Sequence, residues 1–111
     1  MNLQITVSLL TLAGGDLVGF RISGHSGFAE SGSDIVCASI SSAAYLVANT
    51  ITDVIRVAAE VDVDESTGAM LLRVFQKDAV ACRDILQGFK LHMLGLEEQF
   101  PKNIIVNNTE V

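Results

Sequence analysis

The stretch "GHSGFAESGSDIVC", Gly24–Cys37, separates two kinds of periodicity in the sequence. Before it, apolar residues alternate with polar ones, as on a β-strand with one buried face. After it, apolar residues recur every three or four positions, as on a helix. Residues 26–33 hold two glycines, three serines and no period, which is typical of a loop. The change of period at this point predicts an α+β domain.

Two strands are predicted before this stretch. In the first, Leu3, Ile5, Val7 and Leu9 alternate with polar residues. The "GGD" of Gly14–Asp16 then predicts a hairpin turn, because glycine accepts the positive φ that such turns need. The second strand has one apolar face, made by Val18, Phe20 and Ile22.

A helix of about six turns is predicted after the stretch, with Ser33 or Asp34 as its N-cap. Its apolar stripe consists of Val36, Ile40, Ala43, Val47, Ile51, Val54 and Ala58. Residues 35–52 carry no charge, but six of them are Ser, Thr or Asn. This composition favours a buried helix over a membrane span.

The second half of the chain repeats the pattern of two strands and a helix. Strands are predicted at "AEVDVDE" and "AMLLRVF", joined through Ser66–Gly68, and "NIIVN" at 103–107 predicts a last strand. The second helix should start near Asp78 and end near Gly95 and Pro101. Its buried stripe would be Cys82, Ile85, Leu86, Phe89, Met93 and Leu96. The order is ββαββαβ, a single domain over residues 1–111 with two helices on a mixed or antiparallel sheet.

The composition limits the possible partners and compartments. A net charge of −6 argues against nucleic acid as the main partner and favours a basic protein or peptide. The N-terminus lacks the pattern of a signal peptide, so we expect a cytoplasmic protein with no membrane association. Two cysteines so far apart predict reduced thiols rather than a disulfide framework.

No metal or cofactor site is expected from the residue pattern. The chain has no CxxC and no zinc-ligand spacing of His and Cys. Glu60, Asp62 and Asp64 recur at period two, but no glycine-turned calcium loop accompanies them. We interpret these acids as the solvated face of a strand.

His25 and Cys37 are the residues with catalytic potential. The second strand ends at one edge of the sheet, and a helix packed back over the sheet must begin at that edge, so the two side chains should share a rim. A cysteine in the first helical turn is favoured as thiolate by free amides, the helix dipole and an adjacent imidazolium. The same amides could bind an oxyanion. A cysteine at a helix start can also be simple core packing, which we predict for Cys82, and His92 has no evident partner.

Gly24–Ser41, "GHSGFAESGSDIVCASIS", resembles the signature of the bacterial ribosomal-processing cysteine protease family, Prp. The similarity covers 18 contiguous positions and includes His25 and Cys37 at the family spacing. It implies a protease without a cofactor, in which Cys37 is the nucleophile and His25 the general base and acid. The implied substrate is a basic ribosomal protein precursor of the large subunit. The enzyme would remove its short N-terminal extension after a pair of aromatic residues.

Other positions match the same motif. Asp34 could cap the helix or orient His25, and Ser41, one turn beyond Cys37, could bond the site or a backbone carbonyl. The motif glycines, Gly24, Gly27 and Gly32, suggest a flexible substrate loop that closes over bound peptide, and Phe28 could pack this loop on the core or touch the substrate. The family is associated with homodimers, for which the apolar first helix is a plausible contact. A non-catalytic peptide-binding module for ribosome assembly and a redox-sensing thiol are the alternatives.

Overall fold

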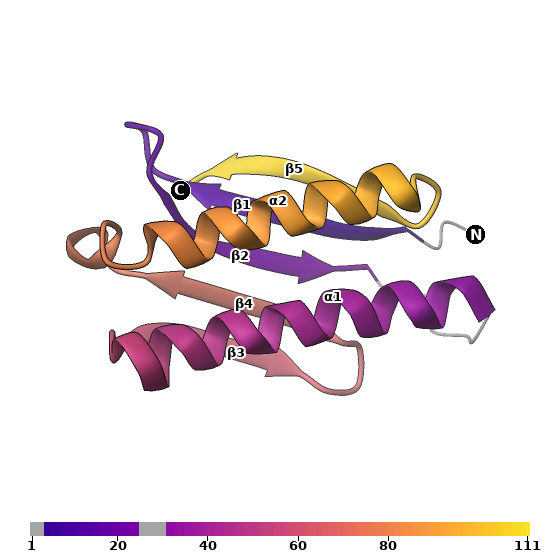
Figure 1. The fold of residues 1–111 in the computed structure, drawn as a ribbon, viewed down its shortest axis with the longest axis horizontal. Helices are drawn as coiled ribbons and strands as arrows, with labels where there is room; N and C mark the ends of the chain where they lie inside the picture. Colours follow the sequence, from indigo (N-terminus) through magenta and orange to yellow (C-terminus); the bar gives the residue numbers. More distant parts are fainter. Residues whose placement is uncertain (1–3, 25–30) are drawn as a thin grey trace.

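The protein is a five-stranded mixed sheet with two helices. The computed structural model describes the backbone of residues 4–24 and 31–111, and the side chains of 4–24 and 35–111. The strands are β1 (Ile5–Thr11), β2 (Leu17–Ser23), β3 (Ala59–Asp64), β4 (Ala69–Val74) and β5 (Ile104–Glu110). They lie in the order β3-β4-β2-β1-β5 (Figure 1). β5 is parallel to β1 and every other pair is antiparallel, so the predicted ββαββαβ order and mixed sheet are confirmed.

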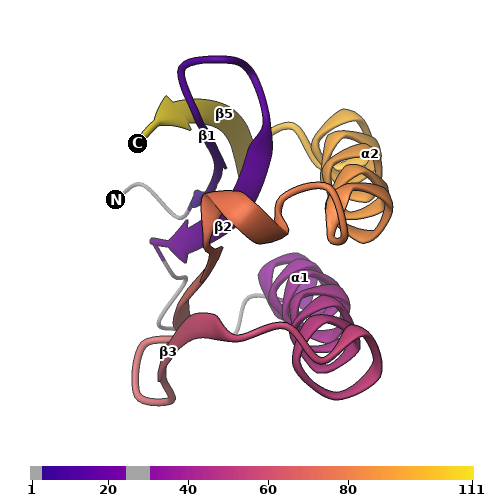
Figure 2. The same cartoon turned by 90° about the vertical axis from the view of Figure 1, so that its left-hand side faces the viewer.

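Both helices cover the same face of the sheet (Figure 2). α1 (Ser31–Asn49) continues into a short π-helix, η1 (Thr50–Ile55), and α2 is Arg83–Gln99. The alternation predicted for β2 explains the packing, because Phe20 points towards the helices and stacks on Phe89 of α2 with 4.2 Å between ring centroids. Glu97 of α2 accepts a hydrogen bond of 2.6 Å from the Val106 amide of β5, which ties that helix to an edge strand.

The helical segment Ile35–Ile55 is long and apolar enough, by length and composition, to cross a membrane. One stripe of it instead packs on the sheet, where Val36, Ile40 and Ile51 are almost completely buried. Its polar residues bond within the helix, as where Thr50 Oγ1 donates to the Leu46 carbonyl at 2.7 Å. This segment therefore contributes one stripe to the core of the domain.

The start and the end of the first helix differ from the prediction. The helix begins at Ser31, so Ser33 and Asp34 are its third and fourth residues and the expected N-cap is wrong. Small polar residues fit here because the first four amides of a helix have no intrahelical acceptor and are satisfied by polar side chains or water. At the other end the π-helix turns the chain by a smaller angle per residue than an α-helix. The apolar register slips as a result, and Val54, expected in the core, is 74% exposed.

The second helix also starts later than predicted. Asp78 closes a short 3₁₀ turn, η2 (Gln76–Asp78), and α2 begins five residues further on. Cys82 therefore lies at the N-cap position of α2, although it is completely buried as expected. Gly95 lies inside the helix, which ends at Gln99 before Pro101. The predicted stripe is otherwise confirmed for Leu86, Phe89, Met93 and Leu96, while Ile85 is half-buried.

Candidate active site

Cys37 borders a small hollow where three segments meet. The hollow has a volume of about 90 Å³ and lies between the end of β2, the first half of α1 and the β3–β4 turn. Its lining consists of Ile5, Ile22, Gly24, Cys37, Ile40, Ser41, Thr67 and Gly68. Cys37 itself is half-buried, packed against the core on one side. The thiol is thus held by the fold and still borders open space.

Gly24 is required by the geometry of this edge. Its φ is +73°, which L-residues rarely adopt, and a Cβ on it would lie 2.7 Å from the backbone oxygen of Gln4. The end of β2 therefore passes directly against the chain entering β1. Gly24, which the sequence placed in a flexible loop, is therefore needed for a fixed turn and for the close approach of two backbone segments.

Ser41 lies one turn of α1 beyond Cys37, on the same flank of the helix, and both residues line the hollow. Its side chain is half-buried. The grouping of Gly24, Cys37 and Ser41 follows from topology: β2 delivers one residue to the sheet edge, and α1 returns over that edge with the other two.

The position of Cys37 within α1 differs from the prediction. It is the seventh residue of the helix rather than a residue of its first turn. The free amides belong to the first four residues, and the dipole effect fades within the first turn. The start of the helix therefore acts on Cys37 less than the sequence suggested.

Cys82 is the other thiol, and the core packing predicted for it is confirmed. It is completely buried, and neither cysteine forms a disulfide. Burial raises the pKa of the Cys82 thiol, and the nearby negative charge of Asp78 raises that pKa further. Cys82 therefore stays protonated at neutral pH.

A second hollow continues from the first along α1. It has a volume of about 270 Å³ and shares Ile22, Ser41 and Gly68 with the hollow at Cys37. The residues that it adds are Tyr45, Val63, Asp64, Glu65 and Met70. Sequence reasoning missed Tyr45 and Glu65. For Tyr45 a signal was present, since it follows Cys37 and Ser41 at the same spacing of four.

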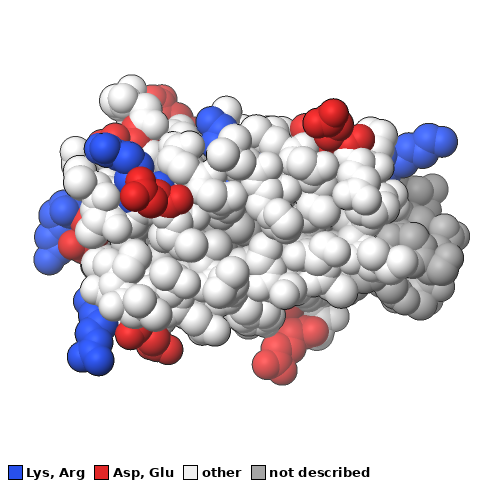
Figure 3. Space-filling model, in the orientation of Figure 1, with Lys and Arg blue, Asp and Glu red and all other residues white. Residues whose placement is uncertain are grey.

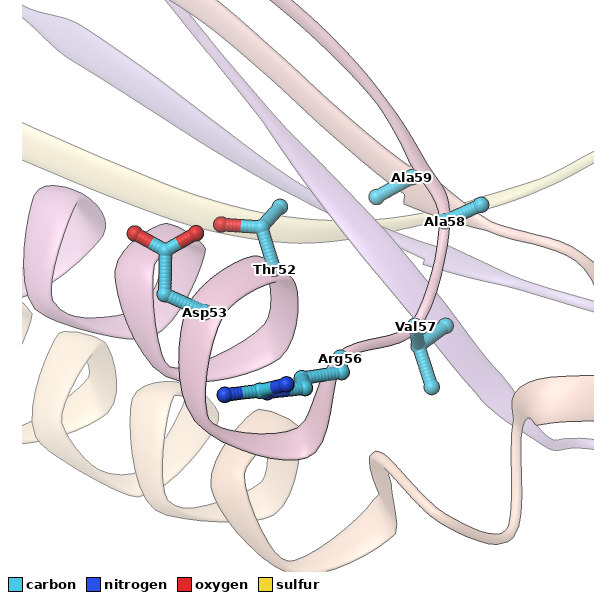
Figure 4. A pocket seen from close by; sticks show the side chains of 6 residues that line it. All are labelled: Thr52, Asp53, Arg56, Val57, Ala58 and Ala59. Carbon is cyan, nitrogen blue, oxygen red and sulfur yellow. The ribbon is translucent and has the colours of Figure 1, made fainter.

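A further hollow lies at the opposite end of the helix and is separate from this site. It has a volume of about 720 Å³ and is lined by Thr52, Asp53, Arg56, Val57, Ala58 and Ala59 (Figure 4). None of these side chains is a cysteine or histidine. Among the side chains of residues 4–24 and 35–111, no group of three or more His, Cys, Asp or Glu could hold a metal ion. Glu60, Asp62 and Asp64 are exposed, as expected for a solvated strand face.

The side chains of several predicted site residues lie outside the described part of the structure. His25, Gly27 and Phe28 lie outside the described residues. Gly32 and Asp34 belong to the first turn of α1, where only the backbone is described. His92, which the sequence left without a partner, is exposed on α2.

Two of the three comparisons found known proteins that are similar to this chain. The model of the family described as cysteine protease Prp matches residues 4–105. A crystal structure of an essential ribosomal processing protease Prp from S. aureus, in complex with a substrate peptide, has a TM-score of 0.86 to this chain. The two sequences are 24% identical, and the match covers 96% of this chain and 100% of that one.

Two further structures are similar. The S. aureus protease with a covalently linked product peptide has a TM-score of 0.83 at 25% identity and covers 96% of this chain and 100% of its own. SMU.848 from Streptococcus mutans has a TM-score of 0.83 at 20% identity, covering 97% of this chain and 96% of its own. The search of curated proteins gave no match.

Proposed function

The chain belongs to the cysteine protease Prp family, and on this premise we propose that Cys37 is its nucleophile and His25 its general base and acid. The observation that carries the proposal is the hollow at Cys37. A half-buried thiol borders open space there, and Gly24, the residue directly before His25, lines the same space. The described residues supply only one other thiol, Cys82, which is buried.

The chemistry follows the order usual for a thiol nucleophile. The imidazole of His25 takes the Cys37 proton, and the thiolate sulfur attacks the carbonyl carbon of the scissile peptide bond. The imidazolium then gives its proton to the leaving amine, which leaves an acyl group on sulfur. Water, activated by the same imidazole, hydrolyses that thioester. Because Cys37 lies beyond the first turn of α1, His25 carries most of the activation.

Supporting roles are proposed for Asp34 and Ser41. Asp34 would orient His25 rather than cap α1, since it is an internal residue of the first turn. Ser41 would hydrogen-bond the bound peptide, because it borders the hollow next to Cys37. Gly27 would let residues 25–30 close over the peptide, with Phe28 packing inside, whereas Gly24 lies in a fixed turn and Gly32 in the first turn of α1.

The proposed substrate is the precursor of a large-subunit ribosomal protein, cut after an aromatic pair to remove a short N-terminal extension. The similar S. aureus protein is a ribosomal processing protease that binds a substrate peptide. The net charge of −6 suits such a substrate, because ribosomal proteins are basic and opposite charges speed association. Ribosomes assemble in the cytoplasm, where we place the activity.

The experiment is direct. Wild-type protein is incubated with the ribosomal protein precursor from the same genome, and the mass of the product gives its N-terminus. We expect a single cut that leaves the mature protein, and no cut by Cys37→Ser. An intact precursor that still binds tightly would instead favour the non-catalytic binding module.

We also propose a homodimer that forms through the outer face of the two helices. This face exposes Ile35 and Leu46 of α1, and Leu91 and Leu94 of α2. The charged side chains lie at its margins and leave its middle uncharged (Figure 3). Large apolar side chains exposed on an uncharged face of this kind favour an interaction site. Leu46→Glu should convert the dimer to a monomer in light scattering, whereas Val61→Glu, on β3, should not.

A further inference from the structure

The two hollows beside Cys37 form one groove. They share Ile22, Ser41 and Gly68, and they run between one flank of α1 and the β3–β4 turn. On the helix the groove follows Cys37, Ser41 and Tyr45, which are spaced four residues apart and so lie on one flank. A peptide whose scissile bond lies at Cys37 can therefore extend along this groove.

The length of the groove fixes how much peptide it takes. With a rise of about 1.5 Å per residue, Tyr45 lies roughly 12 Å along the helix from Cys37. An extended peptide advances about 3.3 Å per residue, so it reaches Tyr45 after three or four residues. The far end of the groove therefore meets one particular side chain of the peptide.

The chemistry at that far end suits a cation. Tyr45 is 45% exposed and offers an aromatic ring, and the half-buried Val63 offers an apolar floor. Asp64 and Glu65 add two carboxylates, and no lysine or arginine is among the described residues that line this hollow. A lysine or arginine stem packs well on such apolar atoms, while its charged head interacts with the ring and the carboxylates.

Asp64 stays ionised through its own turn. Its Oδ1 accepts hydrogen bonds from the Ser66 hydroxyl at 2.6 Å and the Ser66 amide at 3.0 Å, and these lower the pKa of the carboxyl. Asp64 also borders a hollow that contains Arg21 and Asp62. Glu65, which does not line that hollow, is therefore the acid specific to the groove.

We propose that this groove is a specificity subsite that binds a lysine or arginine side chain three or four residues from the scissile bond. The inference rests on the proposed function, since it needs the bond to be cut at Cys37. It adds to that function a requirement on the substrate, a basic residue at a set distance, and assigns its recognition to Tyr45, Asp64 and Glu65.

The test uses a peptide series based on the cleaved precursor. Lys, Ala or Glu is placed at the third and fourth positions on each side of the bond, and kcat/KM is measured for the wild type, Glu65→Lys and Glu60→Lys. Glu60 is the matched control, since it is an exposed acid at the far end of β3, the strand that ends just before Glu65. The wild type should prefer Lys to Ala by about fivefold on one side of the bond, as expected for an exposed ion pair.

Glu65→Lys should lose this preference and favour the Glu peptide, while Glu60→Lys should keep the wild-type order. The preference should shrink at high salt, because the charges are exposed. Equal kcat/KM across the series, or the same loss in Glu60→Lys, overturns the subsite and leaves the protease intact. If no peptide is cut, the proposed function fails. The subsite is then tested by binding alone. Fluorescence anisotropy measures how tightly the same labelled peptides bind to the Cys37→Ser protein, and the order of their affinities decides whether the Lys peptides are preferred.

Discussion

Cys37 and Cys82 both lie near the start of a helix on the same face of the sheet, but their surroundings differ. Cys82 is at the N-cap position of α2, where free amides and the helix dipole favour a thiolate. Cys37 is only the seventh residue of α1. Burial and Asp78 nevertheless raise the pKa of Cys82, whereas Cys37 borders a hollow. Access and neighbours, more than position on a helix, separate the candidate nucleophile from a packing residue.

Activity should separate the two thiols most strongly. Cys37→Ser should lower kcat/KM for the precursor at least about thousandfold, because a hydroxyl is a far weaker nucleophile at neutral pH. Cys82→Ser should change it less than about twofold. Cleavage is measured by mass spectrometry, with circular dichroism as the check on folding. A folded Cys82→Ser protein as inactive as Cys37→Ser would break the comparison.

Alkylation should separate them next. At pH 7 iodoacetamide should modify Cys37 at least about 100-fold faster than Cys82, since Cys82 is completely buried and its pKa is raised. Peptide mapping gives both rates from one sample. In strong denaturant the two rates should converge within about twofold, and similar rates in the native protein would contradict the assignment.

Stability should show the opposite order. Cys82→Ser places a hydroxyl in a fully buried site and should lower the free energy of unfolding by about 1–3 kcal/mol. Cys37→Ser, in a half-buried site, should lower it by less than about 1 kcal/mol. Urea unfolding followed by circular dichroism measures both. A larger loss for Cys37→Ser would mean that Cys37 is the main packing residue.

The smallest expected effect is a dependence of stability on alkaline pH. The pKa of the Cys82 thiol is raised in the folded protein above its ordinary value of 9.0. Above pH 9.0 the unfolded chain therefore binds fewer protons than the folded chain. Stability then falls as pH rises, by at most about 1.4 kcal/mol per pH unit, until the folded thiol also ionises. Cys82→Ala should lack this component. An unchanged slope in that variant, measured by urea unfolding from pH 8 to 10, would remove Cys82 as its source.

The sheet could be predicted closely from the sequence, because alternation is a local signal. β1 and β2 flank a turn in which Gly15 has a φ of +95°, as the "GGD" stretch predicts. Helix boundaries were harder. Residues 31–33 are small and polar, so no apolar period marks the start of α1. The π-helix at 50–55 rotates the residues after it relative to the α-helical period, so a fixed period of about 3.6 residues places them on the wrong face.

Only those parts of the candidate site that follow from the order of strands and helices could be predicted from the sequence. A strand end and a helix start at one edge explain why Gly24, Cys37 and Ser41 meet. The β3–β4 turn, which brings Thr67 and Gly68 to the same hollow, could not be placed there, because its position depends on the pairing of β4 with β2. No local pattern encodes that pairing. Glu65 was missed for the same reason.

The two edges of the sheet bear on whether a further strand can add to it. β3 is one edge strand, and its exposed acids, Glu60, Asp62 and Asp64, would meet carboxylates of a second copy paired in register. On the other edge, β5, the Val106 amide already donates to Glu97. Both edges therefore resist the addition of another strand, which protects an open sheet from aggregation.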